Sequence, residues 1–388
     1  MNKRIFIIAS HDLIYYPPMQ SLLTVFGENN LDVTFIGQNS NEEAQKKFEL
    51  MGIKFESVYG GRGKSMLETH KIRTNYTRTL KAFLHSKQIT NNDLIIYEYG
   101  DSAYFLHSLI SQYRYLILFY EFINEKISWR LELLYRSFNF RQFVQGACAV
   151  IHCEYNRAQI CQWLYGLKKT PYVLPNKPYP GLEGLNLDNA PTDILSRIEE
   201  IKKKVAGRKV ILYQGVFSSS ERRLEEFCQA MALLPQKYVL LAMGYGGYYD
   251  ELKRRYESDS ILFIPFIKSP YHLCVTRLAT IGVLSYFPLN NTLAGVLNPI
   301  YCAPNKVFEY GMFGIPMLSN DIPGLSLIYS QYNCGRAIPS PISSEGVVKT
   351  ITEINEKYEE IQNGSLNYYK SVDFKGSVER ILEDLNMK

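Results

Sequence analysis

The sequence predicts an α/β protein of two domains, each built on a doubly wound parallel sheet, that face each other across a cleft. The chain has 388 residues, which is more than one ordinary hydrophobic core accommodates. Short apolar runs alternate with amphipathic stretches along the whole chain, as strands alternate with helices around a parallel sheet. One stretch rich in Pro, Gly and Asn interrupts this alternation near the middle, and we place the domain boundary there.

The N-terminal half contains six apolar runs of the length expected for buried strands. They are Lys3–Ala9, Leu31–Gly37, Lys54–Tyr59, Asp93–Tyr97, Tyr115–Phe119 and Ala149–His152. Helices are expected over Pro17–Phe26, with proline in the first turn, and over Asn41–Met51, which ends before Gly52. Residues 1–175 are therefore assigned to the N-terminal domain, and residues 176–207 to the linker.

The alternation restarts after the linker. Strands are expected over Lys209–Tyr213, Tyr238–Met243, Ile261–Phe263, Ile281–Ser285 and Pro316–Ser319, and helices over Arg222–Leu234, Tyr249–Tyr256 and Asn305–Phe313. Residues 208–365 form the predicted C-terminal domain. Residues 366–388 include an amphipathic helix, Val372–Leu385, which is expected to pack back on the body of the protein. In sheets of this kind, ligands bind beyond the carboxyl ends of the strands.

Composition limits the classes of function. The formal net charge is +5, which suits anionic substrates and is far from the dense positive charge of a nucleic-acid-binding protein. The seven cysteines have no C-x-x-C spacing, so we expect buried, reduced thiols. The N-terminus has no signal-peptide pattern, and no apolar window is long enough to cross a bilayer. We therefore expect a cytoplasmic protein.

The segment Ala303–Pro316, APNKVFEYGMFGIP, carries the strongest signal. A loop enters a helix that starts at Pro304 or Asn305, and the exposed amide groups of such a helix form an anion site. Lys306 adds a positive charge beside them. One turn later, Glu309 could accept hydrogen bonds from a ribose diol; the alternative is a solvated surface glutamate.

Three other strand ends in this half have features of a nucleotide site. In YQGVFSSSERR, Gly215 is followed by Arg222, a cation suited to a diphosphate. In MGYGG, Gly244 and Gly246 allow the backbone to approach a ligand closely. The loop after the next strand contains Phe266 and Ile267, whose backbone groups either contact a base edge or belong to a plain loop.

Taken in this order, the motifs resemble glycosyltransferase family 4, which has the GT-B fold of two Rossmann-like domains. The resemblance covers nearly the whole chain. It implies that Gly215 and Arg222 bind the donor phosphates, that Gly244 and Gly246 form the next glycine turn, and that Glu309 binds the ribose. It also implies that Phe266 and Ile267 contact the base.

The N-terminal half resembles the same family in LILFYEFIN, VIHCEYNRAQI and PYVLPNKP. The resemblance assigns Glu121 to the family's strand that ends in His–Glu, with Tyr120 where many members have His. His11 ends the first strand, where it either contacts the substrates or has a structural role. The family's paired-glutamate motif has a second departure, because Tyr301 stands seven intervening residues before Glu309, where the first glutamate is expected. Glu121, His11 and Tyr301 are the candidate catalytic residues.

The resemblance implies a retaining transfer of a sugar from a nucleoside diphosphate sugar, with UDP favoured, to a glycan, lipid-linked or protein acceptor in surface polysaccharide or glycoconjugate synthesis. No separate cofactor is expected. The chain has no D-x-D motif and no clustered histidines, so no metal site is predicted either. Two alternatives remain open: an inactive GT-B partner of an active transferase, and an NDP-sugar 2-epimerase. The segment Trp129–Phe143 is interpreted either as an ordinary packed helix or as a peripheral contact with the inner face of an anionic membrane.

Overall fold

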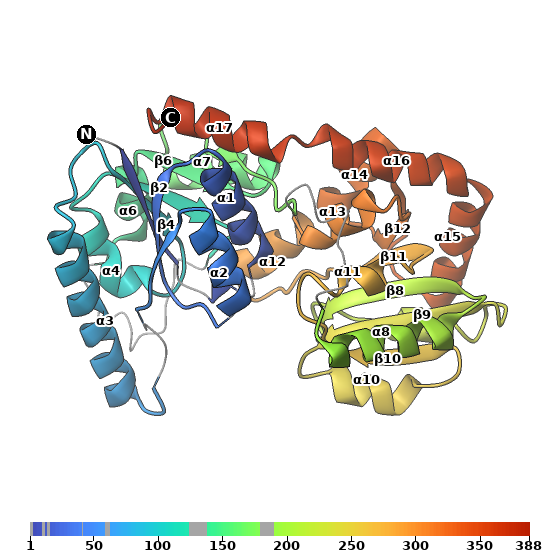
Figure 1. Ribbon diagram of the computed structural model, residues 1–388. Helices are drawn as coiled ribbons and strands as arrows, with labels where there is room; N and C mark the ends of the chain where they lie inside the picture. Colours follow the sequence, from blue (N-terminus) through green and yellow to red (C-terminus); the bar gives the residue numbers. More distant parts are fainter. Residues whose placement is uncertain are drawn as a thin grey trace. The chain divides into compact units, whose positions relative to one another are not determined.

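The computed structural model describes residues 3–9, 12–13, 16–40, 42–58, 63–123, 138–178 and 190–388. The chain divides into two compact units. The N-terminal unit comprises Met1–Tyr179 and Phe374–Lys388, and the C-terminal unit comprises Pro180–Asp373. Each unit is an α/β fold built around one parallel sheet (Figure 1).

The described part of the N-terminal unit has a seven-stranded parallel sheet with the order β3-β2-β1-β4-β5-β6-β7. Its strands are β1 (Arg4–Ile8), β2 (Asp32–Ile36), β3 (Lys54–Glu56), β4 (Leu94–Glu98), β5 (Tyr115–Phe119), β6 (Ala149–His152) and β7 (Tyr172–Val173). Its helices are α1 (Pro17–Glu28), α2 (Glu42–Leu50), α3 (Met66–Ser86), α4 (Ala103–Ile110), α6 (Phe140–Gly146), α7 (Tyr155–Tyr165) and α17 (Phe374–Asp384). All six strands predicted for this half are present, and none of their ends differs by more than three residues.

The last helix of the chain belongs to this first unit. Helix α17 buries Phe374, Val378 and Ile381 in the same core as α1 and the central strands. Arg114, which precedes β5, donates a hydrogen bond to the carbonyl of Leu385 (2.5 Å). The chain therefore returns to its starting unit after completing the second one, as the course of α17 in Figure 1 shows.

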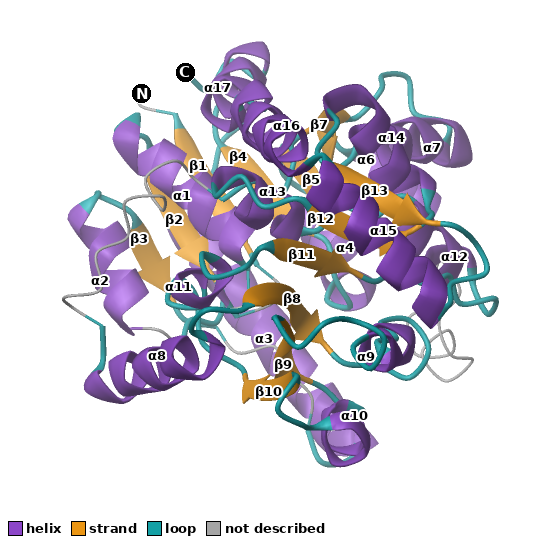
Figure 2. Cartoon of the chain, turned by 90° about the vertical axis from the view of Figure 1, so that its right-hand side faces the viewer, coloured by secondary structure: helices purple, strands orange, loops and turns teal. Residues whose placement is uncertain are grey.

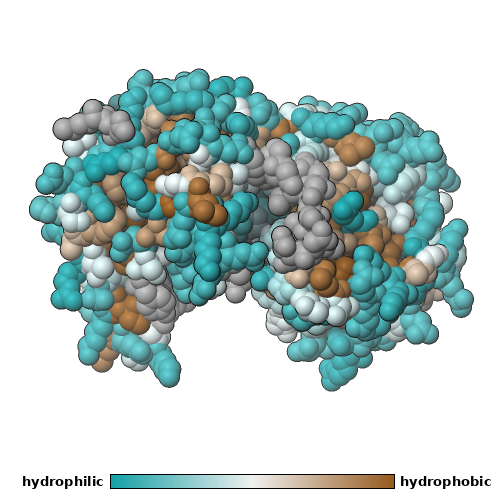
Figure 3. All heavy atoms as spheres, in the orientation of Figure 1, coloured by the Kyte–Doolittle hydropathy of each residue, from teal (hydrophilic) through white to brown (hydrophobic). Residues whose placement is uncertain are grey.

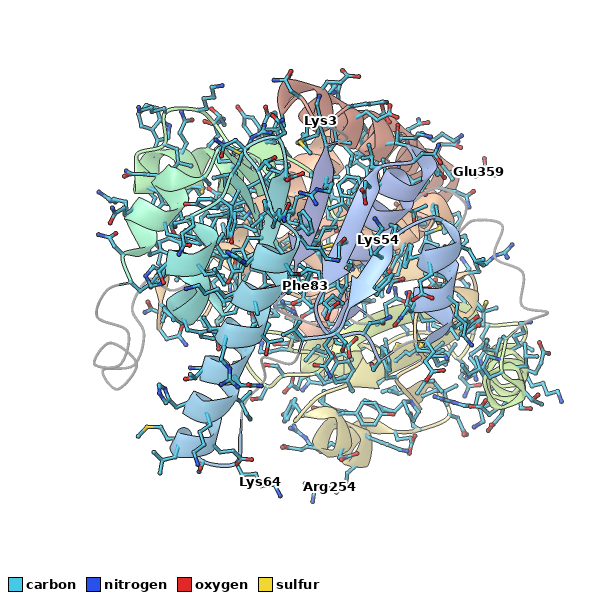
Figure 4. All side chains as sticks on the ribbon, turned by 60° about the vertical axis from the view of Figure 1, so that its left-hand side comes forward. Lys3, Lys54, Lys64, Phe83, Arg254 and Glu359 are labelled. Atoms are coloured by element: carbon cyan, nitrogen blue, oxygen red, sulfur yellow. The ribbon has the colours of Figure 1, made fainter. Side chains whose placement is uncertain are left out.

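Helix α3 is the longest helix of this unit. Ser65 caps it by accepting a hydrogen bond from the amide of Glu68 (3.2 Å). Its C-terminal half packs on the unit through Leu80 and Leu84, whereas its first turn is exposed. Figure 4 shows Phe83 near one end of α3, and Lys64 projecting into solvent at the other.

The described part of the C-terminal unit has a six-stranded parallel sheet with the order β10-β9-β8-β11-β12-β13 (Figure 2). Its strands are β8 (Lys209–Val216), β9 (Tyr238–Tyr245), β10 (Ile261–Pro265), β11 (Ile281–Leu284), β12 (Met317–Asn320) and β13 (Gly335–Ile338). Its helices are α8 (Thr192–Val205), α9 (Glu225–Ala230), α10 (Tyr249–Tyr256), α11 (Leu273–Thr276), α12 (Leu293–Ile300), α13 (Asn305–Met312), α14 (Pro323–Tyr332), α15 (Ser344–Glu356) and α16 (Tyr358–Ser371).

The middle of strand β8 is apolar, as expected where helices cover both faces of a sheet. Val210 and Leu212 face the core that contains α8, α13, α14 and α16. Ile211 and Tyr213 face the opposite core, which contains α9, α10 and α15. At the surface, hydrophilic residues predominate over the visible face, and hydrophobic residues appear in small groups (Figure 3).

Two predicted segments differ from the structure. The stretch assigned to the linker, 176–207, contains helix α8, whose residues Ile194, Ile198 and Ile201 are buried in the C-terminal unit. Their spacing is helical, although the residues before them are rich in Pro and Gly and are typical of a linker. The helix predicted from Arg222 begins only at Glu225 and ends at Ala230.

All seven cysteines are unbridged, as expected. Six of them are buried, and only Cys148 is exposed. Among the helices of the described residues, none is long and apolar enough to cross a membrane.

Candidate nucleotide site

The carboxyl ends of β8 and β9 approach each other through two glycines. Gly215 and Gly244 are paired in the parallel register of these strands, and both have positive φ angles, +139° and +152°. A β-carbon on Gly244 would overlap the carbonyl oxygen of Gly215. Only glycine therefore fits at Gly244. Gly246, with φ +140°, continues the same turn.

Lys306 lies beside this glycine turn. A β-carbon on Gly215 would stand 2.8 Å from the Lys306 Nζ. The ammonium group also lies 5.4 Å from the ring centroid of Tyr213 and 5.3 Å from that of Tyr286. Burial, together with the charge of Arg222, lowers the pKa of Lys306 to about 7, although Glu309 acts in the opposite direction. Lys306 forms no ion pair with any described residue.

Arg222 supplies a second cation to the same place. Its guanidinium carbon lies 4.1 Å from the centroid of the Tyr286 ring, so Tyr286 contacts both cations. Arg222 pairs only loosely with its neighbour Glu221 (3.3 Å). Two cations that share one aromatic ring repel each other, and a bound anion would relieve that repulsion.

The loop that carries Arg222 is tied to the end of β11. The amide of Phe287 donates a hydrogen bond to the carbonyl of Glu221 (2.9 Å), and the Ser285 hydroxyl donates one to the carbonyl of Arg223 (2.5 Å). Because these two carbonyls accept hydrogen bonds from the segment after β11, they do not take part in a helical hydrogen-bond pattern. Helix α9 therefore starts three residues later than predicted. Arg223 has a different role, because it pairs with Glu226 (2.9 Å) and lies over Phe287.

Helix α13 presents its N-terminus to this region. Asn305 and Lys306 are its first residues, and no described side chain caps it at Pro304. The amide of Val307 donates to the carbonyl of Pro304 (3.2 Å), and the amides of Asn305 and Lys306 before it remain available to an anion. The hydroxyl of Tyr310 anchors the helix by donating a hydrogen bond to the carbonyl of Leu212 in β8 (3.1 Å). A side chain at Gly282 of β11 would collide with the Tyr310 ring, so this glycine makes the close approach possible.

Glu309 is buried, with 5% of its surface exposed. One carboxylate oxygen accepts a hydrogen bond from Gln214 Nε2 (2.6 Å), and the other lies 3.1 Å from His272 Nε2. The Thr276 hydroxyl donates to the other end of the Gln214 amide (2.8 Å). Glu309 is therefore a fixed, hydrogen-bonded carboxylate and not a solvated surface residue.

The loop after β10 exposes aromatic surface. The side chain of Phe266 is 45% exposed and that of Tyr245 is 50% exposed, and their ring centroids lie 5.4 Å apart. Ile267, in contrast, is buried. Arg197 of α8 donates a hydrogen bond to the carbonyl of Pro265 (2.9 Å), which fixes the start of this loop.

Two of the candidate catalytic residues belong to different units. Tyr301 ends helix α12 in the C-terminal unit and is half-buried. Glu121 belongs to the N-terminal unit, follows β5 and is exposed. His11 lies outside the described residues. The structure thus brings together the predicted nucleotide-site residues of the C-terminal unit, at the carboxyl edge of its sheet.

The residues just before Glu121 are hydrogen-bonded to the segment that follows β6. Strand β6 ends at His152, and Glu154 caps α7 by accepting a hydrogen bond from the amide of Arg157 (2.8 Å). The carbonyl of Tyr120 accepts hydrogen bonds from Arg157 (2.9 Å) and from Cys153 Sγ (3.0 Å). This network joins the ends of β5 and β6.

Sequence reasoning missed three residues of the Glu309 network, namely Gln214, His272 and Thr276. Gln214 had a detectable signal, because it is the one amide in the apolar run KVILYQGV. His272 and Thr276 had none, since a histidine and a threonine in a loop and a short helix are ordinary residues.

Comparison with solved structures identifies the fold. HepE from Anabaena, in complex with UDP and glucose, has a TM-score of 0.65 with 13% sequence identity over 100% of both chains. Sucrose-phosphate synthase from Thermosynechococcus elongatus has a TM-score of 0.66 with 14% identity over 99% of this chain and 98% of that one. The chain has the GT-B fold.

A third GT-B neighbour is WaaG, a glycosyltransferase involved in lipopolysaccharide biosynthesis, with a TM-score of 0.61 and 12% identity over 98% of this chain and 99% of that one. No family model and no curated protein matches this sequence. The likeness therefore concerns the GT-B fold, with its two Rossmann-like domains, and the chemistry has to be inferred from the site.

Proposed function

We propose that this protein is a glycosyltransferase that takes its sugar from a nucleoside diphosphate sugar bound by the C-terminal unit, with UDP as the preferred nucleotide. The observation that carries the proposal is the pair of cations, Arg222 and Lys306, around Tyr286. They lie with the glycine turn of Gly215 and the uncapped start of α13. A diphosphate supplies the negative charge that this arrangement lacks.

The remaining contacts suit the other parts of a nucleotide. Glu309 offers a fixed carboxylate to the hydroxyls of a ribose. Phe266 and Tyr245 offer exposed rings at the neighbouring strand ends, where a base can stack. The neighbours support UDP as the nucleotide, because HepE was solved with UDP and with UDP-glucose, and MnaA from S. aureus was solved with UDP.

The proposed chemistry is transfer of the sugar with departure of the diphosphate. The bond between the anomeric carbon and the diphosphate oxygen breaks, a bond to an acceptor oxygen forms, and the proton of the acceptor hydroxyl passes to the departing diphosphate. Arg222, Lys306 and the amides of α13 stabilise the charge that develops on the leaving group. Because two cations and a helix terminus are present, the proposal does not require a metal-bridged diphosphate. Following the family resemblance, we propose retention of configuration and assign no protein nucleophile.

The acceptor is proposed to be a glycan, a lipid-linked sugar or a protein in surface-polysaccharide or glycoconjugate synthesis. The segment 129–143 is either a packed helix or a contact with an anionic membrane; its first nine residues lie outside the described part, and Phe140 and Phe143 in its described part are buried. One observation favours a second candidate function. Tyr301 stands where the family motif has an acidic residue, which favours an inactive GT-B protein that binds nucleotide and partners an active transferase.

A thermal-shift panel tests the proposal. The protein is heated with UDP, GDP, ADP or CMP, and then with the matching nucleotide sugars, without added metal. A ligand at about 100 times its dissociation constant stabilises the folded state by about 2.7 kcal/mol, a shift of a few degrees for a chain of this size. We expect UDP to give the largest shift, and no shift with any of these ligands would contradict the proposal.

An activity assay then separates the candidate functions. A transferase releases UDP from its donor when the acceptor is present. An inactive partner binds UDP but releases none. An epimerase converts the free nucleotide sugar without any acceptor, and that result would replace the proposed activity.

A further inference from the structure

The carboxylate of Glu309 is held by side chains from two different segments. Gln214 lies in β8, and its Nε2 is 2.6 Å from one carboxylate oxygen. His272 immediately precedes α11, in the loop that follows β10, and its Nε2 is 3.1 Å from the other oxygen. Each oxygen therefore has its own donor on the protein, and the plane of the carboxylate is set by both.

The chemistry of the partners fixes the direction of these hydrogen bonds. An ionised carboxylate only accepts, so His272 must carry its proton on Nε2 and donate it. The Thr276 hydroxyl donates to Gln214 Oε1 (2.8 Å), which directs the Gln214 amino group toward Glu309. Thr276 also follows His272 by one helical turn, and its amide bonds the carbonyl of His272 (3.0 Å). His272, Gln214 and Thr276 thus act on Glu309 as one network.

His272 contacts Glu309 through Nε2, and its other ring nitrogen has no partner among the described residues. Its side chain is 14% exposed, and its Nδ1 is buried without a hydrogen-bond partner in the described part of the chain. A buried nitrogen that lacks a partner costs free energy. Among the described residues, Glu309 is the hydrogen-bond partner of this imidazole ring.

The two protein donors use only part of the hydrogen-bonding capacity of the Glu309 carboxylate. Each carboxylate oxygen has two acceptor positions, and each uses one of them within the protein. The orientation of the carboxylate sets the directions of the remaining acceptor positions. A ribose diol, which needs two acceptors at a fixed spacing, is recognised only while that orientation is kept.

We propose that His272 is a positioning residue that orients Glu309 and thereby gives the site its preference for ribose over deoxyribose. This inference rests on the proposed binding of a nucleoside diphosphate in the C-terminal unit. It adds a role for His272, Gln214 and Thr276. None of these three side chains needs to touch the nucleotide.

Two amide variants of His272 form a matched pair. In His272→Gln, the amide nitrogen occupies nearly the place of the imidazole Nε2 and can donate to Glu309. In His272→Asn, the side chain is shorter, and its amide nitrogen lies near the place of Nδ1, out of reach of Glu309. Both replacements are polar and uncharged, so the two variants differ in reach.

The experiment measures dissociation constants by calorimetry for UDP, 2′-deoxy-UDP, 3′-deoxy-UDP and pyrophosphate. In the wild type we expect UDP to bind about tenfold or more tightly than either deoxy analogue, the factor for a hydrogen bond to a charged group. His272→Asn should reduce this ratio to about twofold, and His272→Gln should keep most of it. The affinity for pyrophosphate should be the same in all three proteins. His85→Asn, at an exposed position of α3, is the control and should leave every value unchanged.

A second variant keeps the test decisive if His272→Asn does not fold. Thr276→Val keeps the shape of the buried side chain but releases the Gln214 amide, and it should lower the ribose preference by about threefold. An unchanged preference for UDP over its deoxy analogues in a folded His272→Asn or Thr276→Val protein would overturn the inference. Equal losses for UDP, the deoxy analogues and pyrophosphate would also overturn it, because they would indicate a general structural role. Absence of UDP binding to the wild type would instead contradict the proposed function, and with it this inference.

Discussion

The guanidinium carbon of Arg222 lies 4.1 Å from the ring centroid of Tyr286, and this contact sets the position of one of the two site cations. The ammonium group of Lys306 lies 5.3 Å from the same centroid. One aromatic ring thus holds two positive charges next to the glycine turn that ends β8. A cation over a ring gains about 0.5–2 kcal/mol, which helps to hold the Arg222 guanidinium, and the Lys306 ammonium whenever it is protonated, in place before an anion arrives.

Replacing Arg222 should separate phosphate binding from nucleoside binding. We expect Arg222→Ala to weaken binding of UDP by about 1.5–3 kcal/mol, the range for hydrogen bonds to charged groups. The affinity for uridine, which has no phosphate, should stay within about 0.5 kcal/mol of wild type. Arg223→Ala is the matched control, because Arg223 pairs with Glu226 and lies over Phe287. Similar losses for UDP and uridine in Arg222→Ala would show that Arg222 does not contact phosphate.

Replacing Glu309 should weaken binding of the nucleoside part of the ligand. Glu309→Ala removes the buried carboxylate, and we expect uridine and UDP to lose about 1.5–3 kcal/mol each. Glu359→Ala removes an exposed carboxylate from α16 in the same unit (Figure 4) and should leave both affinities unchanged. Calorimetry at one pH measures both variants. An unchanged affinity in folded Glu309→Ala protein would remove Glu309 from the site.

The low pKa of Lys306 predicts proton uptake on binding. Burial and Arg222 lower this pKa to about 7, so the free protein has a mostly neutral Lys306 at pH 8. A bound diphosphate favours the charged form, so UDP should bind with uptake of close to one proton, and affinity should fall as pH rises from about 7 to 10. Calorimetry at pH 8 in two buffers of different ionisation enthalpy measures the uptake. Lys306→Met should abolish it, and identical heats in the two buffers with wild-type protein would contradict the prediction.

The same pKa has a consequence for stability without ligand. An unfolded lysine has a pKa of about 10.4, so between about pH 7 and 10 the unfolded chain binds more protons at this position than the folded chain. The contribution of Lys306 to the free energy of unfolding should therefore increase with pH across that window. Urea denaturation of wild type and Lys306→Met at several pH values compares the two slopes, and the variant should show the smaller increase.

The glycine turn should tolerate no side chain at Gly244. Gly244→Ala places a methyl group into the carbonyl of Gly215 at a φ of +152°. We expect the free energy of unfolding to fall by about 2–4 kcal/mol, from overpacking and backbone strain together. Gly247→Ala is the control, because a β-carbon there meets nothing within 4 Å, and its effect should be under about 1 kcal/mol. Equal stability of the two variants in urea denaturation would show that the turn relaxes.

The sequence by itself determined the α/β class and the parallel arrangement, and it indicated the residues of the candidate site. Alternating apolar and amphipathic segments specify strands and helices through the burial of their side chains. The glycines at 215, 244 and 246 mark strand ends because few other residues adopt their backbone angles. The segment Ala303–Pro316 predicted a helix over Asn305–Phe313, and the structure has α13 over Asn305–Met312.

Only the tertiary structure decided how these residues act. Helix α8 was assigned to the linker because a Pro- and Gly-rich stretch precedes it, and its burial in the core shows that it belongs to the C-terminal unit. Helix α9 starts late because the segment after β11 donates hydrogen bonds to the carbonyls of Glu221 and Arg223. Glu309 obtains its donors from Gln214 and His272, which lie 95 and 37 residues away in the chain. Local patterns report burial and backbone angles, whereas the partners of a buried charge depend on which distant segments meet.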